Sequence, residues 1–360
     1  MKVFASYDWG IGVPAFLLLS ISLIVLSSLD IELFQSQLIF SILGILMFFI
    51  VSSLHIQSLR NLHILFYICS LILLVSLFLV GVEVRGARRW IEFFGVRIQF
   101  SELVKPALIL AFASLLSRWR GKVSLVNLLT SGALFIPIAF LLLRQPDLGS
   151  ALIYAVTFVS MLFFGGMGMW YIIVGLLFTT ISLPLIWRLL AEYQRNRIIT
   201  FINPKHDPQG IGYNAIQSAI AVGSGLLLGR GLGRGVQSQL QFLPERHTDF
   251  IFATLSEEFG FLGSCVLLTV YFLLFFRILQ IARNTDDLFE LYTIIGIFML
   301  LLSQTFMNIG MNVGLVPIAG VTLPLLSYGG SSLISTMVLL GIVNAISITK
   351  MDKKGTLEIR

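Results

Sequence analysis

Apolar runs of about 20 residues recur along the whole chain, and they constrain its fold more than any other feature. A helix of that length crosses the hydrocarbon core of a bilayer and satisfies its own backbone groups there. Runs such as LLLSISLIVL and LILLVSLFLV do not alternate between apolar and polar residues, as the strands of a membrane β-barrel would. We therefore predict an all-α polytopic membrane protein with about ten transmembrane helices. The predicted spans lie near residues 9–28, 35–53, 62–81, 101–117, 124–143, 148–165, 168–190, 250–275, 288–310 and 323–348.

The composition argues against soluble classes of protein. Only 12% of the 360 residues are charged, against roughly 25% in a typical soluble domain. A net charge of +6 would suggest nucleic-acid binding in a soluble protein, but here it indicates charge sorting across a bilayer. Cys69 and Cys265 lie in apolar runs and predict neither a disulfide nor a metal site. We expect one membrane domain over residues 1–360, no nucleic-acid partner, and a first span that is not cleaved.

The basic residues predict the orientation of the chain. Short cytoplasmic loops carry an excess of Lys and Arg, and an even number of spans puts both termini on one side. With the N-terminus inside, the inner loops hold the larger share of basic residues, so both termini are predicted to be cytoplasmic. Segments 81–100 and 191–249 then lie on the outer face, the second as a long loop between the seventh and eighth spans.

Both outer segments are nevertheless rich in arginine. In segment 81–100, basic residues alternate with aromatic and aliphatic ones, which suits an amphipathic segment in the membrane interface. Basic residues on the outer face oppose the insertion bias, so we consider an anionic ligand at the outer leaflet, with lipid headgroups as the alternative. The candidate arginines are Arg85, Arg88, Arg89, Arg195, Arg197, Arg230 and Arg234.

The fourth predicted span begins with polar residues. Ser101 is placed as a helix N-cap, and Glu102 and Lys105 lie three residues apart on one helical face, where they can pair. Charged residues within a span are costly and indicate a functional site, although a structural ion pair is the alternative. Pro106 is expected to kink the helix and to open a cavity.

Two further motifs have both a structural and a functional interpretation. Asp147 follows Pro146 at the start of the sixth span, where it either caps the helix or contacts a ligand. Glycines between residues 223 and 235 expose backbone N–H groups, and Arg230 and Arg234 lie among them. Such a segment could cradle phosphate oxygens, and flexible packing is the alternative.

Asp249 stands at the boundary between the long loop and the eighth span, and apolar residues follow it at once. Partial burial would raise the pKa of its carboxyl group and suit it to general-base catalysis, while helix capping is the alternative. Glu257 and Glu258 are acids inside the same span and indicate a wet polar cavity. His247 lies nearby, but two ligands are too few to predict a metal site. Small residues over 308–332 favour close helix packing or broken helix at membrane depth.

Five segments between residues 80 and 340 resemble the SEDS family (shape, elongation, division and sporulation), to which RodA and FtsW belong. The short chain and the early Tyr7-Asp8-Trp9 are more similar to RodA than to FtsW. Asn214 stands where the family is expected to have Gln, and two leucines, Leu226 and Leu227, interrupt a glycine run that is usually tighter. The segments are GARRWIEFFGVRIQFSELVKP, QPDLGSALI, FINPKHDPQGIGYNAIQSAIAVGSG, FLPERHTDFIFATLSEEFGFLG and NIGMNVGLVPIAGVTLPLLSYGGSS.

The resemblance implies a ten-span peptidoglycan glycosyltransferase of the bacterial cytoplasmic membrane. Such enzymes polymerise lipid II into glycan strands on the outer face, beside a class B penicillin-binding protein and other proteins of the elongation machinery. The family's essential aspartate falls on Asp249, and its glutamate and lysine at the start of the fourth span fall on Glu102 and Lys105. The candidate substrate-binding residues are Arg85, Arg88, Arg89, Asp147, Arg195, Arg197, Gln217, Ser218, Arg230, Arg234, His247, Thr248 and Ser327.

Asp249 would then act as general base for the acceptor hydroxyl, with undecaprenyl pyrophosphate as the leaving group. The outer arginines would stabilise the charge of that group, and Lys105 would hold a phosphate or position Asp249 through Glu102. No cofactor is predicted, apart from a divalent cation, Mg²⁺ or Mn²⁺, that could share this task. The alternatives are a lipid II flippase, in which Glu102, Lys105, Glu257 and Glu258 would be gates or proton carriers, and a non-catalytic scaffold of the elongation machinery.

Overall fold

The fold is a bundle of long apolar helices. The computed structural model describes residues 7–84, 87–93, 96–119, 121, 123–204, 207 and 210–357. Among these residues, eight helical segments are long and apolar enough to cross a membrane, which confirms the predicted polytopic helical fold. They are α2 (Trp9–Leu29), α3 (Ile31–Ser52), α5 (His63–Val80), α6 with α7 (Phe100–Leu103 and Lys105–Ser117), α8 (Leu125–Arg144), α14 (Ile251–Arg283), α15 (Leu288–Asn312) and α16 (Gly330–Leu357).

Two further apolar helices lie where the sixth and seventh spans are expected. These are α9 (Leu148–Phe164) and α10 (Met169–Leu189), and the apolar stretch of each is shorter than that of the eight spans. The predicted count of ten spans stays a prediction. The remaining helices are α4 (Ile56–Asn61), which connects α3 to α5, and α11 (Glu192–Ile202), α12 (Ile211–Ser224) and α13 (Val236–Gln239), which lie within the predicted long loop.

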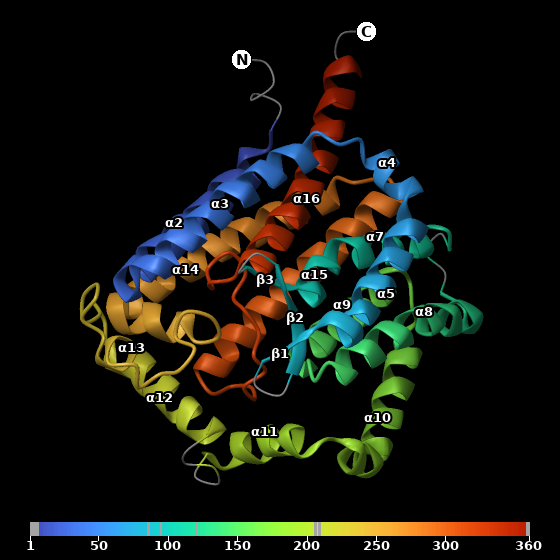
Figure 1. The fold of residues 1–360 in the computed structure, drawn as a ribbon. Helices are drawn as coiled ribbons and strands as arrows, with labels where there is room; N and C mark the ends of the chain where they lie inside the picture. The colour runs from blue at the N-terminus through green and yellow to red at the C-terminus, as the bar shows by residue number, and fades with distance from the viewer. Residues whose placement is uncertain are drawn as a thin grey trace.

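The helices define two ends of the bundle. Helix α2 begins and α16 ends at the same end, which we call the termini end, while α11 and α12 lie across the opposite end (Figure 1). That opposite end, which we call the site end, also holds the three strands and the start of α14. The predicted tenth span begins later than expected, because residues 313–329 form a turn-rich segment without helix before α16 starts.

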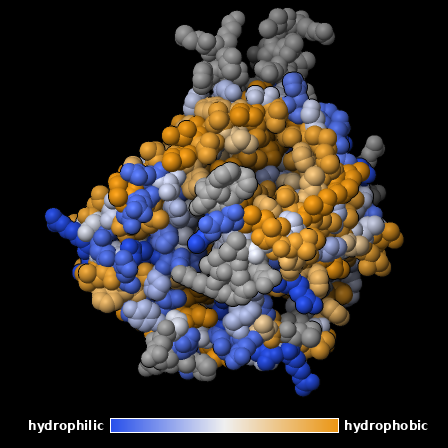
Figure 2. All heavy atoms as spheres, viewed as in Figure 1, coloured by the Kyte–Doolittle hydropathy of each residue, from blue (hydrophilic) through white to orange (hydrophobic). Residues whose placement is uncertain are grey.

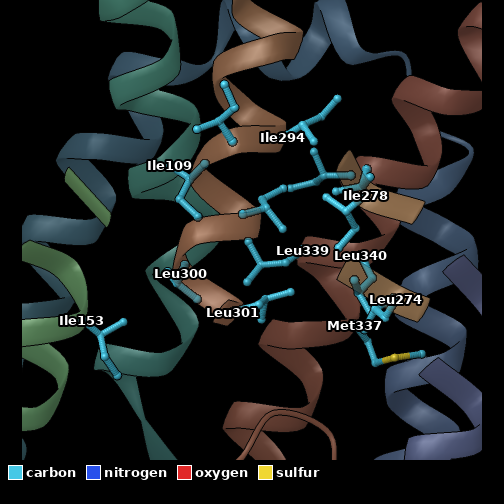
Figure 3. Close-up of a cluster of buried hydrophobic side chains, with 14 of the residues drawn as sticks. Ile109, Ile153, Leu274, Ile278, Ile294, Leu300, Leu301, Met337, Leu339 and Leu340 are labelled. Carbon is cyan, nitrogen blue, oxygen red and sulfur yellow. The ribbon is translucent and has the colours of Figure 1, made fainter. Parts of the chain in front are cut away.

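Aliphatic side chains from five helices form the centre of the bundle. Ile109 of α7, Ile153 of α9, Leu274 of α14, Leu300 of α15 and Leu340 of α16 are all buried there (Figure 3). The opposite faces of the peripheral helices expose large apolar side chains, as they would to lipid. Apolar residues accordingly cover much of the surface in Figure 2, and hydrophilic residues interrupt it mainly toward the site end.

Segment 81–100 forms a small antiparallel sheet, which the all-α prediction missed. Strands β1 (Val82–Val84), β2 (Ala87–Phe93) and β3 (Val96–Gln99) follow one another in the sheet. Ile91 pairs with Ile98 in the register of β2 and β3. Alternation of β-branched and charged residues, which we interpreted as an amphipathic segment, is also the pattern of a strand with one covered face.

An ion pair connects helices at the termini end. Asp8 caps the start of α2 and accepts two hydrogen bonds from Arg277 of α14, at 2.9 Å (Nε–Oδ1) and 2.8 Å (Nη2–Oδ2). Ser347 of α16 donates to the same carboxylate at 2.6 Å. Helices α2, α14 and α16 are therefore fixed to one another at this end.

Candidate functional site

Asp249 lies in the turn before α14, and two side-chain amides of α15 hold its backbone. Asn308 Nδ2 donates to the carbonyl oxygen of Asp249 at 2.9 Å, and Asn312 Nδ2 donates to the same oxygen at 3.0 Å. We call this pair of donors the amide clamp. Asn312 Oδ1 also accepts from the backbone N–H of Ala253 in the first turn of α14, at 3.1 Å. The clamp therefore fixes the backbone of Asp249 without using its carboxylate.

The residues before Asp249 are fastened to the segment that precedes α16. Ser327 Oγ donates to the carbonyl oxygen of Thr248 at 2.6 Å, and the Tyr328 N–H donates to that of His247 at 2.8 Å. The rings of His247 and Tyr328 meet edge to face, with their centroids 5.6 Å apart. His247, Thr248 and Ser327, which we predicted to bind substrate, thus help to build the turn that carries Asp249.

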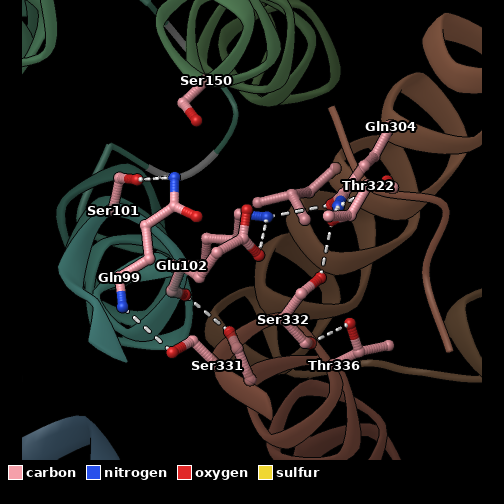
Figure 4. A network of polar contacts seen from close by, with 12 residues as sticks. Gln99, Ser101, Glu102, Ser150, Gln304, Thr322, Ser331, Ser332 and Thr336 are labelled. Atoms are coloured by element: carbon pink, nitrogen blue, oxygen red, sulfur yellow. Dashed lines mark hydrogen bonds and ion pairs between the residues drawn. The ribbon is translucent and has the colours of Figure 1, made fainter. Parts of the chain in front are cut away.

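A stripe of amides runs along α15 toward the termini end. Gln304, Asn308 and Asn312 are spaced four residues apart and so share one helical face. Gln304 Oε1 accepts a hydrogen bond from Lys105 Nζ at 2.9 Å (Figure 4). Lys105 in turn pairs with Glu102 at 2.5 Å, and both side chains are buried, which confirms the predicted ion pair. The stripe connects this ion pair to the backbone of Asp249.

Four consecutive residues, 319–322, lie between the stripe and the carboxylate. Gly320 has a positive φ of 67°, which favours glycine, and a Cβ atom there would lie in van der Waals contact with Asp249 Oδ2, at 3.5 Å. Position 320 is therefore a neighbour of the carboxylate. The other contacts of the segment are the Ala319 carbonyl with Arg197 Nη1 (3.2 Å), the Val321 carbonyl with Asn308 Nδ2 (2.6 Å) and the Thr322 carbonyl with Gln304 Nε2 (3.0 Å).

The start of the fourth span differs from its prediction. Gln99, not Ser101, precedes the first turn of α6, and Ser101 Oγ instead donates to Asp147 Oδ2 at 3.1 Å. The helix breaks at Val104, and Pro106 occupies the first turn of α7, where a proline is well tolerated. An apolar pocket lies beside this break and is lined by residues of α3, α4, α5, α6, α7 and α16, among them Leu103, Pro106 and Val338.

Asp147 is buried at the site end, where it contacts both α9 and β2. It caps α9 as predicted, accepting from the Ser150 N–H at 3.2 Å, and its Oδ1 lies 3.7 Å from Arg89 Nη1. Arg89 also donates to the backbone carbonyls of Gln145, at 3.0 Å, and Pro146. Arg89 and Asp147 thus join β2 to α9, and the predicted contact of both with substrate stays a prediction.

Arg197 of α11 is the predicted cation that the structure connects to Asp249. Its guanidinium lies 5.9 Å from the ring centroid of Tyr193 and donates to Ala319. Burial, together with the positive charge of Arg89, lowers the pKa of Arg197, while the charges of Asp249 and Asp147 act in the opposite direction. Arg197 therefore shares one electrostatic environment with Asp249.

The glycine-rich loop, residues 225–235, does not present its amides to a ligand as predicted. The N–H groups of Arg230 and Gly231 donate to the carbonyls of Glu257 and Glu258, at 2.9 and 3.0 Å. The Gly233 N–H donates to the Glu258 carboxylate at 3.0 Å. These amides are occupied by α14, so the prediction of a backbone phosphate cradle is wrong for them.

The buried side chains of Glu257 and Glu258, for which a wet polar cavity was predicted, bind neighbouring segments: Glu257 binds α13, and Glu258 binds the glycine-rich loop and α2. Glu257 is fully buried and accepts from the Gln237 N–H (2.8 Å), the Ser238 N–H (3.0 Å) and the Ser238 hydroxyl (2.8 Å). Glu258 accepts from Ser28 Oγ at 2.7 Å. Hydrogen bonding of this kind compensates a buried carboxylate for the loss of water.

The remaining predicted site residues are dispersed. Ser218 is buried and donates to the carbonyl of Asn312 at 2.9 Å, beside the amide clamp. Arg195 donates to the Arg188 carbonyl at 2.6 Å, and Gln217 is half-buried on α12. Arg230 and Arg234 are exposed on the glycine-rich loop. Arg85 and the side chain of Arg88 lie outside the described residues.

The amide stripe has no counterpart in the sequence predictions. Residues 308–332, which include Asn308 and Asn312, are predicted to favour close helix packing or broken helix, and no role is predicted for Gln304. Amides repeated every four residues in an otherwise apolar span are themselves a signal, because each unsatisfied amide in hydrocarbon is costly and needs a partner in the protein.

The fold and the site define a multi-pass membrane protein with an aspartate centre at one end of a helical bundle. The chain belongs to the cell cycle protein family of FtsW, RodA and SpoVE, whose model matches residues 9–352. This membership confirms the resemblance to SEDS proteins.

Individual relatives cover most of the chain. It is 42% identical to the peptidoglycan glycosyltransferase MrdB of Escherichia coli K12 over 281 residues, which are 78% of this chain and 76% of MrdB. It is 35% identical to a probable peptidoglycan glycosyltransferase FtsW of Coxiella burnetii, over 95% of this chain and 96% of the relative.

Solved structures show the same fold. A chain of a peptidoglycan synthase complex that coordinates polymerization and crosslinking superposes with a TM-score of 0.83 at 34% identity, covering 95% of this chain and 97% of that one. The crystal structure of the rod shape determining protein RodA of Thermus thermophilus superposes with a TM-score of 0.72 at 30% identity, covering 95% and 96%.

Proposed function

We propose that this chain is a peptidoglycan glycosyltransferase that polymerises lipid II into glycan strands. The relatives are named peptidoglycan glycosyltransferase MrdB and probable peptidoglycan glycosyltransferase FtsW. The observation that carries the proposal is the amide clamp, which holds the backbone of Asp249, whose carboxylate lies near Gly320 and within the electrostatic reach of Arg197. A carboxylate on a held backbone, in the field of a cation, suits general-base catalysis on an anionic substrate.

In this proposal Asp249 takes the proton of the acceptor's GlcNAc 4-hydroxyl. The hydroxyl oxygen forms a bond to C1 of the donor's MurNAc as the bond from C1 to the pyrophosphate oxygen breaks. Undecaprenyl pyrophosphate leaves with the electron pair, and the configuration at C1 inverts because the displacement is direct. The proton stays on Asp249 until it is released to water.

The negative charge of the leaving group needs a cation near Asp249. Arg197 is the candidate that the electrostatics favour, because Arg89 is committed to Asp147 and to backbone carbonyls. Among the described residues no three His, Cys, Asp or Glu side chains lie close enough to hold a metal ion. A divalent cation, Mg²⁺ or Mn²⁺, would share with Arg197 the neutralisation of the leaving group's charge.

Glu102 and Lys105 are proposed to position Asp249 and not to touch the substrate. Both are buried, and Lys105 Nζ reaches only as far as Glu102 and Gln304 among the contacts described. Their effect passes along the amide stripe to the backbone of Asp249. We propose that the apolar pocket beside α7 accommodates part of a polyprenyl chain, since its lining is almost entirely apolar.

We propose that the protein lies in the bacterial cytoplasmic membrane with the site end outward and both termini cytoplasmic. The excess of basic residues in the loops at the termini end supports this orientation. By analogy with the solved synthase complex that coordinates polymerization and crosslinking, we propose a class B penicillin-binding protein as partner, together with other proteins of the elongation machinery.

A polymerisation assay distinguishes the enzyme from the flippase and the scaffold. Purified protein, with and without the partner, receives fluorescent lipid II and Mg²⁺, and glycan strands are resolved on a gel. We expect strands that disappear in the Asp249→Asn variant. Lipid II translocation in proteoliposomes without polymerisation would favour the flippase. Glu257 and Glu258 offer that alternative little support as proton carriers, because α13 and the glycine-rich loop already donate hydrogen bonds to them. Neither activity, even with the partner present, would favour the scaffold.

A further inference from the structure

The glycine-rich loop replaces hydrogen bonds that α14 has lost. Gly260 interrupts α14 with a φ of 68° and a ψ of −161°. In an unbroken helix the Phe261 and Leu262 N–H groups would donate to the carbonyls of Glu257 and Glu258. Here those two N–H groups donate to the carbonyls of Leu226 and Leu227, at 2.8 and 3.1 Å.

The two carbonyls freed by the same break are also taken by the loop. Glu257 O and Glu258 O accept from the Arg230 and Gly231 N–H groups, as described above. All four backbone groups that the break exposes are therefore satisfied. The exchange needs close contact, because a Cβ atom on Gly229 would overlap the carbonyl of Glu258.

This exchange takes place at the edge of the membrane core. Helices α2 and α14 run antiparallel, with Arg277 level with Asp8 at the start of α2 and Glu258 level with Ser28 at its end. The 21 residues of α2 measure about 31 Å, which is the thickness of the hydrocarbon core. Gly260 and the loop that pairs with it thus lie at the hydrocarbon boundary on the site end.

The tip of the loop is apolar and exposed. Leu226, Leu227 and Leu228 expose 79%, 67% and 77% of their surface. Their hydrogen-bonded neighbours on α14, Phe261 and Leu262, expose 60% and 53%. The tip is continuous with the lipid-facing surface of α14.

We propose that Leu226–Leu228 insert into the acyl-chain region of the leaflet at the site end and anchor the glycine-rich loop in the membrane. Non-helical backbone is tolerated at membrane depth only where its polar groups are satisfied, and α14 satisfies the carbonyls of Leu226 and Leu227. The exposed Arg230 follows the tip after one residue, Gly229. A cation in this position suits the headgroup layer next to the acyl chains. A transmembrane helix of a partner is the competing occupant, and the experiment below tests it.

The experiment measures which solvent surrounds the tip. In a variant with Cys69 and Cys265 replaced by Ser, a single cysteine is introduced by Leu227→Cys and labelled with an environment-sensitive fluorophore. Phe272→Cys on the exposed face of α14, where Phe272 is 64% exposed, is the lipid control. Asp286→Cys in the exposed turn after α14 is the aqueous control. Each variant is placed in nanodiscs of phosphatidylglycerol and phosphatidylethanolamine, with or without brominated acyl chains.

At position 227 we expect a loss of fluorescence by brominated lipid comparable to that at position 272, and quenching by aqueous iodide no greater than at 272. Iodide quenching at 227 equal to that at 286 would overturn the proposal. Each measurement is repeated with the class B penicillin-binding protein bound. If the partner abolishes quenching by brominated lipid at 227 but not at 272, the tip is a partner site and the proposal is wrong.

Discussion

The side-chain amide of Asn312 donates to the backbone carbonyl of Asp249 at 3.0 Å, and its Oδ1 accepts from the Ala253 N–H at 3.1 Å. One side chain thus bridges the turn that carries Asp249 and the first turn of α14. Asn308 adds a second donor to the same carbonyl at 2.9 Å. The position of the Asp249 backbone therefore depends on the last turns of α15, which carry both amides.

Replacing Asn312 with Ala should slow the reaction without changing the affinity for lipid II. The loss of one donor leaves the Asp249 carbonyl with one amide, and we expect kcat to fall about tenfold, or about 1.4 kcal/mol, with little change in KM. Steady-state polymerisation kinetics measure both constants.

Thr305→Val is the matched control on the same helix. Thr305 is buried, and its hydroxyl has no hydrogen-bond partner among the described residues. Its replacement should leave kcat unchanged. Equal losses of kcat in the two variants would mean that α15 is merely sensitive to substitution and that the clamp has no special role.

The Glu102–Lys105 pair allows a double-mutant test of positioning. Lys105→Met or Glu102→Gln alone leaves a buried charge unpaired, so each should destabilise the protein by about 3–5 kcal/mol. The double variant removes both charges and should melt at a higher temperature than either single variant. Thermal melts in nanodiscs measure this.

Activity of the double variant separates stability from positioning. Met cannot donate to Gln304, so the link from Lys105 to the amide stripe is still missing and polymerisation should stay low. Full recovery of activity together with stability would contradict the proposed positioning role of Lys105.

Glu257→Gln should loosen α13 and, with it, the glycine-rich loop that precedes α13. Each carboxylate oxygen of Glu257 accepts from a backbone N–H, of Gln237 or of Ser238, so the NH₂ group of a glutamine would face a donor in either orientation. We expect a loss of about 1–3 kcal/mol and faster proteolysis within the loop. The exposed Glu192 provides the control variant Glu192→Gln, which should melt like the wild type.

Arg197→Met should alter the pH dependence of polymerisation. The positive charge of Arg197 favours the ionised form of nearby Asp249, so its removal makes the base harder to ionise. Because the reaction needs the carboxylate, the acidic limb of the pH–rate profile should move to higher pH. The loss of the cation proposed to stabilise the leaving group should separately lower the rate at neutral pH about tenfold. Arg195→Met, on the same helix but bonded to Arg188, should leave the profile in place.

Local spacing in the sequence predicted those parts of the site whose partners lie within one helix or one cap. The Glu102–Lys105 pair follows from a separation of three residues, and the cap by Asp147 follows from its place before α9. The apolar runs located the spans because the bilayer imposes the length of each helix.

The functions of Glu257, Glu258 and Arg89 could not be predicted in the same way. Many of their partners are backbone groups of segments that are distant in sequence and come close only when the chain folds. The break of α14 at Gly260 brings the glycine-rich loop onto the two acids, and the docking of β2 against α9 brings Arg89 to Asp147. The sheet itself was missed because three short strands at a membrane interface share their alternating pattern with an amphipathic segment.

The role of Asp249 as general base is tested by comparing the turnover of an Asp249 variant with its binding of lipid II. Asp249→Asn keeps the backbone carbonyl that Asn308 and Asn312 hold, so the variant should melt like the wild type and still bind lipid II. With the partner and Mg²⁺ present, it should form no glycan strands. Strands formed by a folded Asp249→Asn variant at the wild-type rate would show that Asp249 is not the general base.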